Sequence, residues 1–183
     1  MNTDKHNGSK MKIGTVQVYT GDGKGKTTAA LGQALRASGH GLRVIVIQFM
    51  KGQIKYGELS AVKNIPGFII EQYGLPTFVD KNNPSKEDKE LAKKGFERAK
   101  EVIDSGEYDM VILDEANITL DYGLLKLDEV INLIKRKPRN VELILTGRYA
   151  PKEIIEIADL VTETHEVKHH YQKGVQAREG IEY

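Results

Sequence analysis

The chain has 183 residues, which is enough for one domain with a well-buried core and too few for two ordinary domains. Hydrophobic residues make up 39% and charged residues 29% of the chain, a balance typical of a globular protein rather than a disordered one. The formal net charge of +1 favours neither nucleic acid nor a membrane surface as partner, and the absence of cysteine excludes disulfides, thiolate metal sites and cysteine nucleophiles.

The N-terminal residues predict neither a secretion signal nor a membrane anchor. Residues 1–11 are polar and lack the apolar region of a signal peptide, so we expect a flexible lead-in followed by a single domain over residues 12–183. No apolar run approaches the ~20 residues that span a bilayer. We therefore expect a cytoplasmic protein.

The domain is predicted to begin with a strand over residues 13–19, which runs directly into a glycine-rich loop. A helix is expected from Thr27, because alanine and leucine recur there at helical spacing. Gly39 and Gly41 are expected to end this helix, as glycines commonly do at helix C-termini.

The middle of the chain predicts two strands and a long helix. Residues 42–49 are apolar almost throughout, which is typical of a parallel strand covered on both faces. Residues 68–72 predict a weaker strand. Ser85 and Asp88 resemble a capping box, which opens a helix that runs to about Ile103. The expected inner face of this helix is Ala92, Phe96, Ala99, Val102 and Ile103.

The last part of the domain predicts three more strands alternating with helices. The expected elements are a strand at residues 110–113, a helix around residues 127–134 that Pro138 stops, a strand at 141–145, a short helix at 151–158 and a strand at 160–162. This alternation predicts a single-domain α/β fold with a doubly wound, mostly parallel sheet and helices on both faces. Ligands of such sheets bind beyond the carboxyl ends of the strands.

The loop after the first strand has the composition of a phosphate-binding loop. Its glycines let backbone N–H groups turn toward phosphate oxygens, and the following helix directs its positive dipole end to the same place. Lys26 supplies a mobile charge, Thr27 a hydroxyl for Mg²⁺, and Thr28 a donor to a phosphate oxygen. The alternative is an ordinary glycine turn. The loop reads Gly21-Asp22-Gly23-Lys24-Gly25-Lys26-Thr27.

This loop departs from the usual spacing of phosphate-binding loops. The pattern G-x-x-x-x-G-K-[ST] places its first glycine five residues before Gly25, where this chain has Thr20. The first glycine, Gly21, comes one residue late. We therefore expect the phosphates to lie differently from those in an ordinary nucleotide hydrolase.

Further candidate residues follow the predicted strands. Asp114 and Glu115 come after an apolar run and are expected to hold Mg²⁺ directly or through water, the alternative being an acidic turn. Lys51 and Arg148 follow two other strands and are candidates for phosphate contacts, the alternative for each being an exposed surface residue. The adjacent histidines at 169–170 favour a polar surface segment over a metal site.

Together these segments resemble the ATP:corrinoid adenosyltransferases of the cobalamin pathway. The resemblance covers residues 13–183 in order, and the offset loop with the closing Gly-Ile-Glu-Tyr sequence is its most specific part. It rests on residues 20–30, Gln48-Phe49-Met50-Lys51-Gly52, Leu113-Asp114-Glu115, Thr146-Gly147-Arg148, Val167-Lys168-His169 and Gly174-Val175-Gln176-Ala177-Arg178-Glu179-Gly180-Ile181-Glu182-Tyr183.

The resemblance implies a P-loop, RecA-like fold and a particular reaction. Reduced Co(I) of a corrinoid attacks the 5′ carbon of ATP, and triphosphate leaves, with ATP reversed in the loop relative to other P-loop proteins. It also implies a Mg²⁺ cofactor, a flavodoxin-like electron-donating reductase and a homodimer. Lys26 and Thr27 would stabilise the leaving group, and Asp114 and Glu115 would serve Mg²⁺ or its water shell rather than act as bases.

An aromatic residue before the long helix is implied to displace the lower axial ligand of the corrinoid. This chain departs from the family there because it has no tryptophan. Phe78 is the first candidate for that role and Tyr73 the next. A second departure is Asn117, after the acidic pair.

Two other functions remain as alternatives. One is a P-loop ATPase or kinase that cleaves at the γ-phosphate, which Asp114 and Glu115 favour and the offset loop disfavours. The other is a non-catalytic module that binds ATP and changes shape without turnover.

Overall fold

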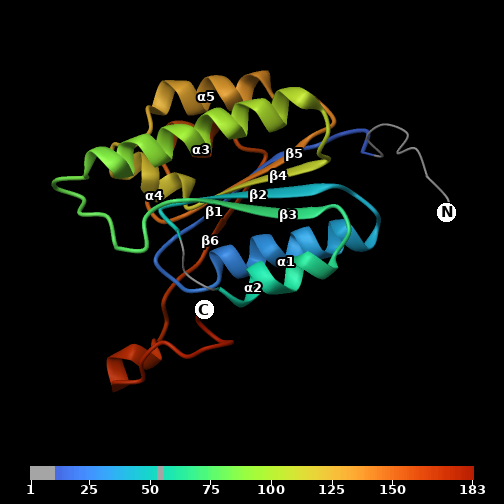
Figure 1. Ribbon diagram of the computed structural model, residues 1–183. Coiled ribbons are helices and arrows are strands. Elements are labelled where there is room, and N and C mark those ends of the chain that lie inside the picture. The colour runs from blue at the N-terminus through green and yellow to red at the C-terminus, as the bar shows by residue number, and fades with distance from the viewer. Residues whose placement is uncertain (1–10, 53–55) are drawn as a thin grey trace.

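A computed structural model describes residues 11–52 and 56–183 of the chain (Figure 1). The expected lead-in lies outside the described residues except for Met11. The strands are β1 (Val16–Thr20), β2 (Val44–Phe49), β3 (Phe68–Tyr73), β4 (Met110–Asp114), β5 (Glu142–Thr146) and β6 (Leu160–Glu163). The helices are α1 (Lys26–Gly39), α2 (Gly57–Ala61), α3 (Lys86–Ser105), α4 (Ala116–Asp121), α5 (Leu127–Arg136) and α6 (Lys152–Ile157), and the 3-10 turns are η1 (Val62–Asn64) and η2 (His170–Lys173).

The six strands form one sheet in the order β3-β2-β4-β5-β1-β6, and every neighbouring pair in it is parallel. Figure 1 shows α3, α4 and α5 over one face of the sheet and α1 and α2 over the other. The predicted α/β class with a doubly wound sheet is therefore confirmed. Because β5 lies between β1 and β4, the glycine loop after β1 and the acidic pair after β4 reach one edge of the sheet with the end of β5 between them.

Side chains that alternate along the buried strands point to opposite faces of the sheet and form a hydrophobic core on each face. In β2, Ile45 and Ile47 pack in the cluster that contains the inner face of α3, whereas Val44 and Val46 pack with the alanines of α1. Both sides of this strand are buried, which is why its sequence is apolar almost throughout. The α1 contacts are small residues, so this helix can approach the sheet closely.

The capping box at the start of α3 is present as predicted. The Ser85 hydroxyl accepts a hydrogen bond from the Asp88 amide at 3.0 Å, and the Asp88 carboxylate accepts one from the Ser85 amide at 3.0 Å. The helix ends beyond the expected Ile103, where Gly106 takes the left-handed conformation with φ 65°. All five residues of the predicted inner face are buried.

The short helices and the start of the first strand differ from the sequence expectations. Helices α2 and α4 were not predicted, because five or six residues are too few to reveal a helical period. The equally short α6 was predicted because Pro151 marks its first turn. The first strand begins at Val16 rather than at residue 13, since the Gly14 amide donates to the Arg139 carbonyl at 2.7 Å instead of joining the ladder.

In the described ranges, no helix combines the length and apolar character needed to cross a bilayer.

The capping box makes the stability of α3 testable. Replacing Ser85 with alanine removes the acceptor of the Asp88 amide, so we expect Ser85→Ala to lower the free energy of unfolding by about 1 kcal/mol. Urea denaturation would measure it, with Lys93→Ala on an exposed position of the same helix as control. Equal stabilities of the two variants would show that the cap does not stabilise the helix.

Candidate functional site

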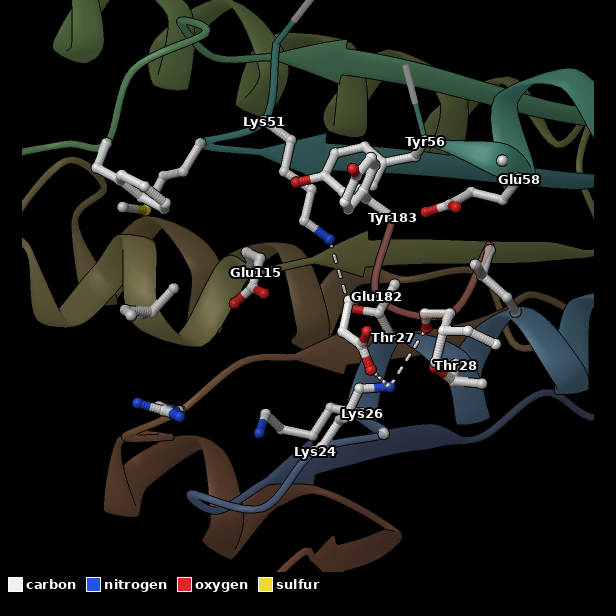
Figure 2. Close-up of a pocket in the computed structure, with 18 of the residues that line it drawn as sticks. Lys24, Lys26, Thr27, Thr28, Lys51, Tyr56, Glu58, Glu115, Glu182 and Tyr183 are labelled. Carbon is white, nitrogen blue, oxygen red and sulfur yellow. Dashed lines mark hydrogen bonds and ion pairs between the residues drawn. The ribbon is translucent and has the colours of Figure 1, made fainter. Parts of the chain in front are cut away.

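A cavity of about 860 Å³ lies where the carboxyl ends of the central strands meet (Figure 2). Its volume is in the range of small-molecule sites in proteins. It is lined by residues 22–28 of the glycine loop, Leu31, residues 50–51, 56–58 and 75–79, Glu115, Ile118, Tyr122, Arg148, His169 and residues 180–183. Of the predicted site residues, only Gly21 and Asp114 lie behind this lining.

Among the described residues, Lys26 of the glycine loop has no carboxylate partner at hydrogen-bond distance. Its ammonium donates to the backbone carbonyls of Gly21 at 2.8 Å and Gly23 at 2.6 Å. Partial burial lowers the pKa of Lys26, but Glu115 and Asp22 oppose that shift. Gly25, with φ +114°, turns the chain directly into α1. Because both hydrogen-bond partners of Lys26 are neutral, its charge remains available to an anion in the loop.

Two of the loop glycines also pack against the segment that follows β6. A Cβ atom on Gly21 would lie 2.2 Å from the Thr164 carbonyl oxygen, and one on Gly23 would lie 2.8 Å from the backbone of His165. The Gly23 amide donates to the Thr164 carbonyl at 2.9 Å. These glycines therefore permit a close backbone approach, a role that the phosphate pattern alone did not suggest.

Asp114 is fully buried behind the loop and accepts four hydrogen bonds. One carboxylate oxygen accepts from the hydroxyls of Thr27 at 2.8 Å and Thr146 at 2.6 Å. The other accepts from Lys51 at 2.7 Å and Gln48 at 3.1 Å. Burial alone would raise the pKa of Asp114, but the Lys51 charge and these hydrogen bonds lower it below its ordinary value. The carboxylate thus joins α1, β2 and β5 to β4.

Lys51 is held by this carboxylate rather than solvated at the surface. Its side chain is 15% exposed and that of Asp114 is 1% exposed. Burial favours the neutral amine, but the carboxylates of Asp114 and Glu115 raise the pKa of Lys51 above its ordinary value. The pair is therefore charged at neutral pH, and Lys51 carries its charge to the wall of the cavity.

Glu115 lies at the cavity wall in a left-handed backbone conformation, with φ 61°. Its amide donates to the Thr146 hydroxyl at 3.0 Å. Burial first, and the neighbouring Asp114 next, raise the pKa of its carboxyl. Met50 and Tyr149 also have positive φ and follow β2 and β5, so unfavourable backbone conformations gather at this edge of the sheet, as is common at functional sites.

The described ranges hold no group of three or more His, Asp or Glu side chains placed to bind a metal ion on their own. Oxygen donors behind and beside the loop include the Thr27 hydroxyl and the carboxylates of Asp114 and Glu115. Such donors suit Mg²⁺, which usually takes one or two protein ligands and completes its shell with phosphate and water. The rings of His169 and His170 stack 4.6 Å apart, and His169 lines the cavity.

Arg148 is exposed and reaches the glycine loop from the end of β5. Its guanidinium donates to the Asp22 carbonyl at 3.2 Å. Asn117 is fully buried and supports the turn before Arg148, because its amide donates to the Gly147 carbonyl at 3.2 Å. The family departure at Asn117 therefore lies outside the residues that line the cavity.

The other side of the cavity is largely apolar. Phe78 lines it and is fully exposed, at 103% of its reference area. The structure does not bring Tyr73 to this cavity, since its hydroxyl donates to Glu71 at 2.9 Å beside α3. Lys81 fixes the end of the Phe78 loop through a 2.6 Å ion pair with Asp121. Sequence reasoning missed the other apolar and aromatic lining residues: Leu31, Met50, Tyr56, Leu75, Pro76, Val79, Ile118, Tyr122, Ile181 and Tyr183.

Comparison with known proteins assigns this architecture to one family. The model of the family described as ATP:corrinoid adenosyltransferase BtuR/CobO/CobP matches residues 12–183. A corrinoid adenosyltransferase from Sinorhizobium is 38% identical over 172 residues, covering 93% of this chain and 80% of that protein. The Escherichia coli K12 corrinoid adenosyltransferase is 38% identical over 170 residues, covering 93% and 86%. Corrinoid adenosyltransferase CobA of Salmonella typhimurium is 37% identical, with the same two coverages.

Removing Lys51 tests the buried ion pair through its pH dependence. Lys51→Met leaves the Asp114 carboxylate buried without its cation, so we expect a loss of about 3 kcal/mol of stability at pH 7. In the wild type, the depressed pKa of Asp114 gives stability that is present above the unfolded-state pKa and lost as the pH falls through the folded-state value. In the variant the pKa rises, so the difference between the two proteins should shrink in acid.

Urea denaturation from pH 7 down to about pH 2.5, which passes below the unfolded-state pKa of Asp114, would measure this difference. The matched control is Lys86→Met, whose side chain is 91% exposed and whose loss should matter little at any pH. A loss from Lys51→Met that stays constant across this pH range would contradict a charged Lys51–Asp114 pair.

Proposed function

We propose that the cavity beside the glycine loop is the active site of this chain, which belongs to the ATP:corrinoid adenosyltransferase family BtuR/CobO/CobP and has corrinoid adenosyltransferase activity. Its substrates are ATP and a corrinoid. One observation carries the assignment of the site. A cationic loop suited to a polyphosphate and an exposed apolar loop suited to a flat macrocycle line the same cavity.

The reaction forms a carbon–cobalt bond and breaks a carbon–oxygen bond. The Co(I) electron pair attacks the 5′ carbon of ATP, the bond from that carbon to the triphosphate oxygen breaks, and the triphosphate leaves with its electron pair. No proton moves at the carbon, so no general base is needed. The protein must position the two substrates and stabilise the charge that develops on the leaving group.

The glycine loop is suited to stabilise this leaving group. In the part of the chain that the structure describes, Lys26 donates only to backbone carbonyls, so it can turn to phosphate oxygens without breaking an ion pair. The loop amides and the Thr28 hydroxyl add donors around the same space. Lys24 and Arg148 line the same wall and bring further positive charge.

Magnesium fits the oxygen donors beside the loop. When bound, it would supply further neutralisation of the triphosphate charge. The Thr27 hydroxyl would hold the ion, and Asp114 would orient that hydroxyl by accepting a hydrogen bond from it, as it does at 2.8 Å. Asp114 is already paired with Lys51, so we assign Glu115 rather than Asp114 to the water shell of the ion.

Phe78 is proposed to contact the corrinoid and to favour loss of its lower axial ligand, which makes Co(II) easier to reduce. Its full exposure supports this role, because a large aromatic side chain in water gains free energy from a flat apolar partner. The Lys81–Asp121 pair would hold the loop in place. The flavodoxin-like reductase, the homodimer and the cytoplasmic location stay predictions.

The products of an anaerobic reaction test the proposed use of the loop. With MgATP and chemically reduced cobalamin we expect adenosylcobalamin and intact triphosphate. We expect Lys26→Ala to lower kcat by about 10²–10³-fold, the effect of removing one preorganised donor. The corrinoid spectrum and chromatography of the phosphates would measure both. ADP with an unchanged corrinoid would instead indicate cleavage at the γ-phosphate, and near-normal turnover of Lys26→Ala would contradict its role.

Comparison of two starting oxidation states tests Phe78. We expect Phe78→Ala to slow the reaction from Co(II), with a reductant present, about tenfold more than the reaction from pre-reduced Co(I). Val79→Ala in the same loop is the matched control and should not separate the two rates. Equal losses from both oxidation states would mean that Phe78 only shapes the cavity.

A further inference from the structure

Residues 178–183, here called the tail, contact the glycine loop directly. The Lys24 ammonium donates to the Ile181 carbonyl at 3.5 Å and lies 3.9 Å from the Glu182 carboxylate. Upstream of the tail, the Glu166 amide donates to the Asp22 carboxylate at 3.3 Å. Together with the Gly23–Thr164 hydrogen bond, these contacts make the loop and the segment after β6 one connected wall.

Glu182 makes side-chain contacts that hold the tail in its conformation, in addition to backbone hydrogen bonds within residues 178–183. Its carboxylate accepts from the Arg178 amide at 2.9 Å and from the Arg178 guanidinium at 3.2 and 3.3 Å. His170 lies 3.7 Å away, and the Glu182 side chain is only 13% exposed. The Arg178 hydrogen bonds lower the pKa of Glu182 to about 2, so its charge is fixed at neutral pH.

The ion pair between Glu182 and Arg178 affects how the tail influences anion binding in the loop. An unpaired carboxylate beside the loop would repel a triphosphate. The Arg178 guanidinium instead neutralises Glu182, and Lys24 adds a second cation close by. Glu182 is therefore not an unpaired anion beside the loop, because both Arg178 and Lys24 lie within ion-pair distance of its carboxylate.

Tyr183 places an aromatic ring in the same cavity. Figure 2 shows Glu182 and Tyr183 from the tail in the cavity together with the loop lysines and with Tyr56 at the start of α2. Tyr183 remains 43% exposed and its ring has no aromatic partner among the described residues. Tyr56 already faces a cation, with the Lys51 ammonium 5.4 Å from its ring centre.

We propose that the tail is part of the ATP site, in which Glu182 fixes the tail to the glycine loop and Tyr183 contacts the nucleoside. This inference rests on the proposed function, which places the triphosphate in the loop. The nucleoside then lies beyond the loop phosphates, within the same cavity, where an exposed aromatic ring offers a stacking surface to a base. Tyr183 is therefore a specificity-determining residue for a nucleotide over a bare polyphosphate.

Binding of two anions separates the nucleoside contact from the loop contact. Calorimetric titrations with MgATP and with magnesium triphosphate need neither a corrinoid nor turnover. We expect Tyr183→Ala to weaken ATP roughly fivefold to tenfold, the effect of losing one stacked base, and to leave triphosphate unchanged. Tyr183→Phe keeps the ring and should bind ATP as the wild type does. Glu182→Gln should also weaken ATP selectively, because it releases the tail.

Tyr171→Ala is the matched control, because this tyrosine is 64% exposed in η2 and does not line the cavity. Equal weakening of ATP and triphosphate by Tyr183→Ala would overturn the nucleoside contact in favour of an effect on the loop. Tighter binding of ATP by Tyr183→Ala would overturn the proposal and indicate that the tail blocks the site. Unchanged ATP affinity in this variant would exclude a contact between Tyr183 and the nucleoside. Absence of adenosyl transfer by a wild type that binds ATP in this pattern would instead count against the proposed function alone.

Discussion

The buried carboxylate of Asp114 is the constraint on which the rest of the site depends. A buried charge is tolerated only when it is paired and fully hydrogen-bonded, and all four donors to Asp114 come from other elements. Satisfying this carboxylate places the hydroxyl of Thr27 and the ammonium of Lys51 at one point. The first residues of α1, the end of β2 and the end of β5 are thereby fixed relative to β4 before any substrate binds.

The same constraint divides the chemistry of the cavity into two parts. The cation of Lys51 is paired with Asp114, whereas the partners of Lys26 among the described residues are neutral carbonyls, so Lys26 keeps its charge for a ligand. A reaction that expels triphosphate from carbon needs this free positive charge and needs no base, so the network can be closed and static. The part of the cavity proposed to bind the corrinoid needs an apolar surface instead of charge, and the exposed ring of Phe78 provides one.

Sequence patterns predicted the parts of the molecule that repeat or follow a local rule. The long α3 was predicted from its capping box and from the helical spacing of its apolar residues, and β2 was predicted from its apolar run. The placement of Lys51 and Glu115 at the cavity follows from parallel strands that end at one edge. The short α2 and α4 have too few residues to show a period, and no proline marks their first turn as Pro151 marks that of α6. The tail could not be placed, because its position depends on contacts such as Lys24–Ile181, which join residues far apart in the sequence and obey no local pattern.

The glycines of the loop show why local patterns give only part of a residue's role. A Cβ atom on Gly25 would meet no atom of the described residues within 4 Å. This open space fits the expected function of Gly25, which is to admit a ligand and to start α1. Gly21 and Gly23 lack space for a side chain because residues 164–165 pack against them. Their small size therefore serves the junction between the loop and the segment that leads to the tail. Since that junction also carries the Gly23–Thr164 hydrogen bond, a change that shifts residues 164–165 would move the phosphate-binding backbone and the tail together. The geometry of the loop is thus set by its contacts with residues 164–165 as well as by the glycine motif itself.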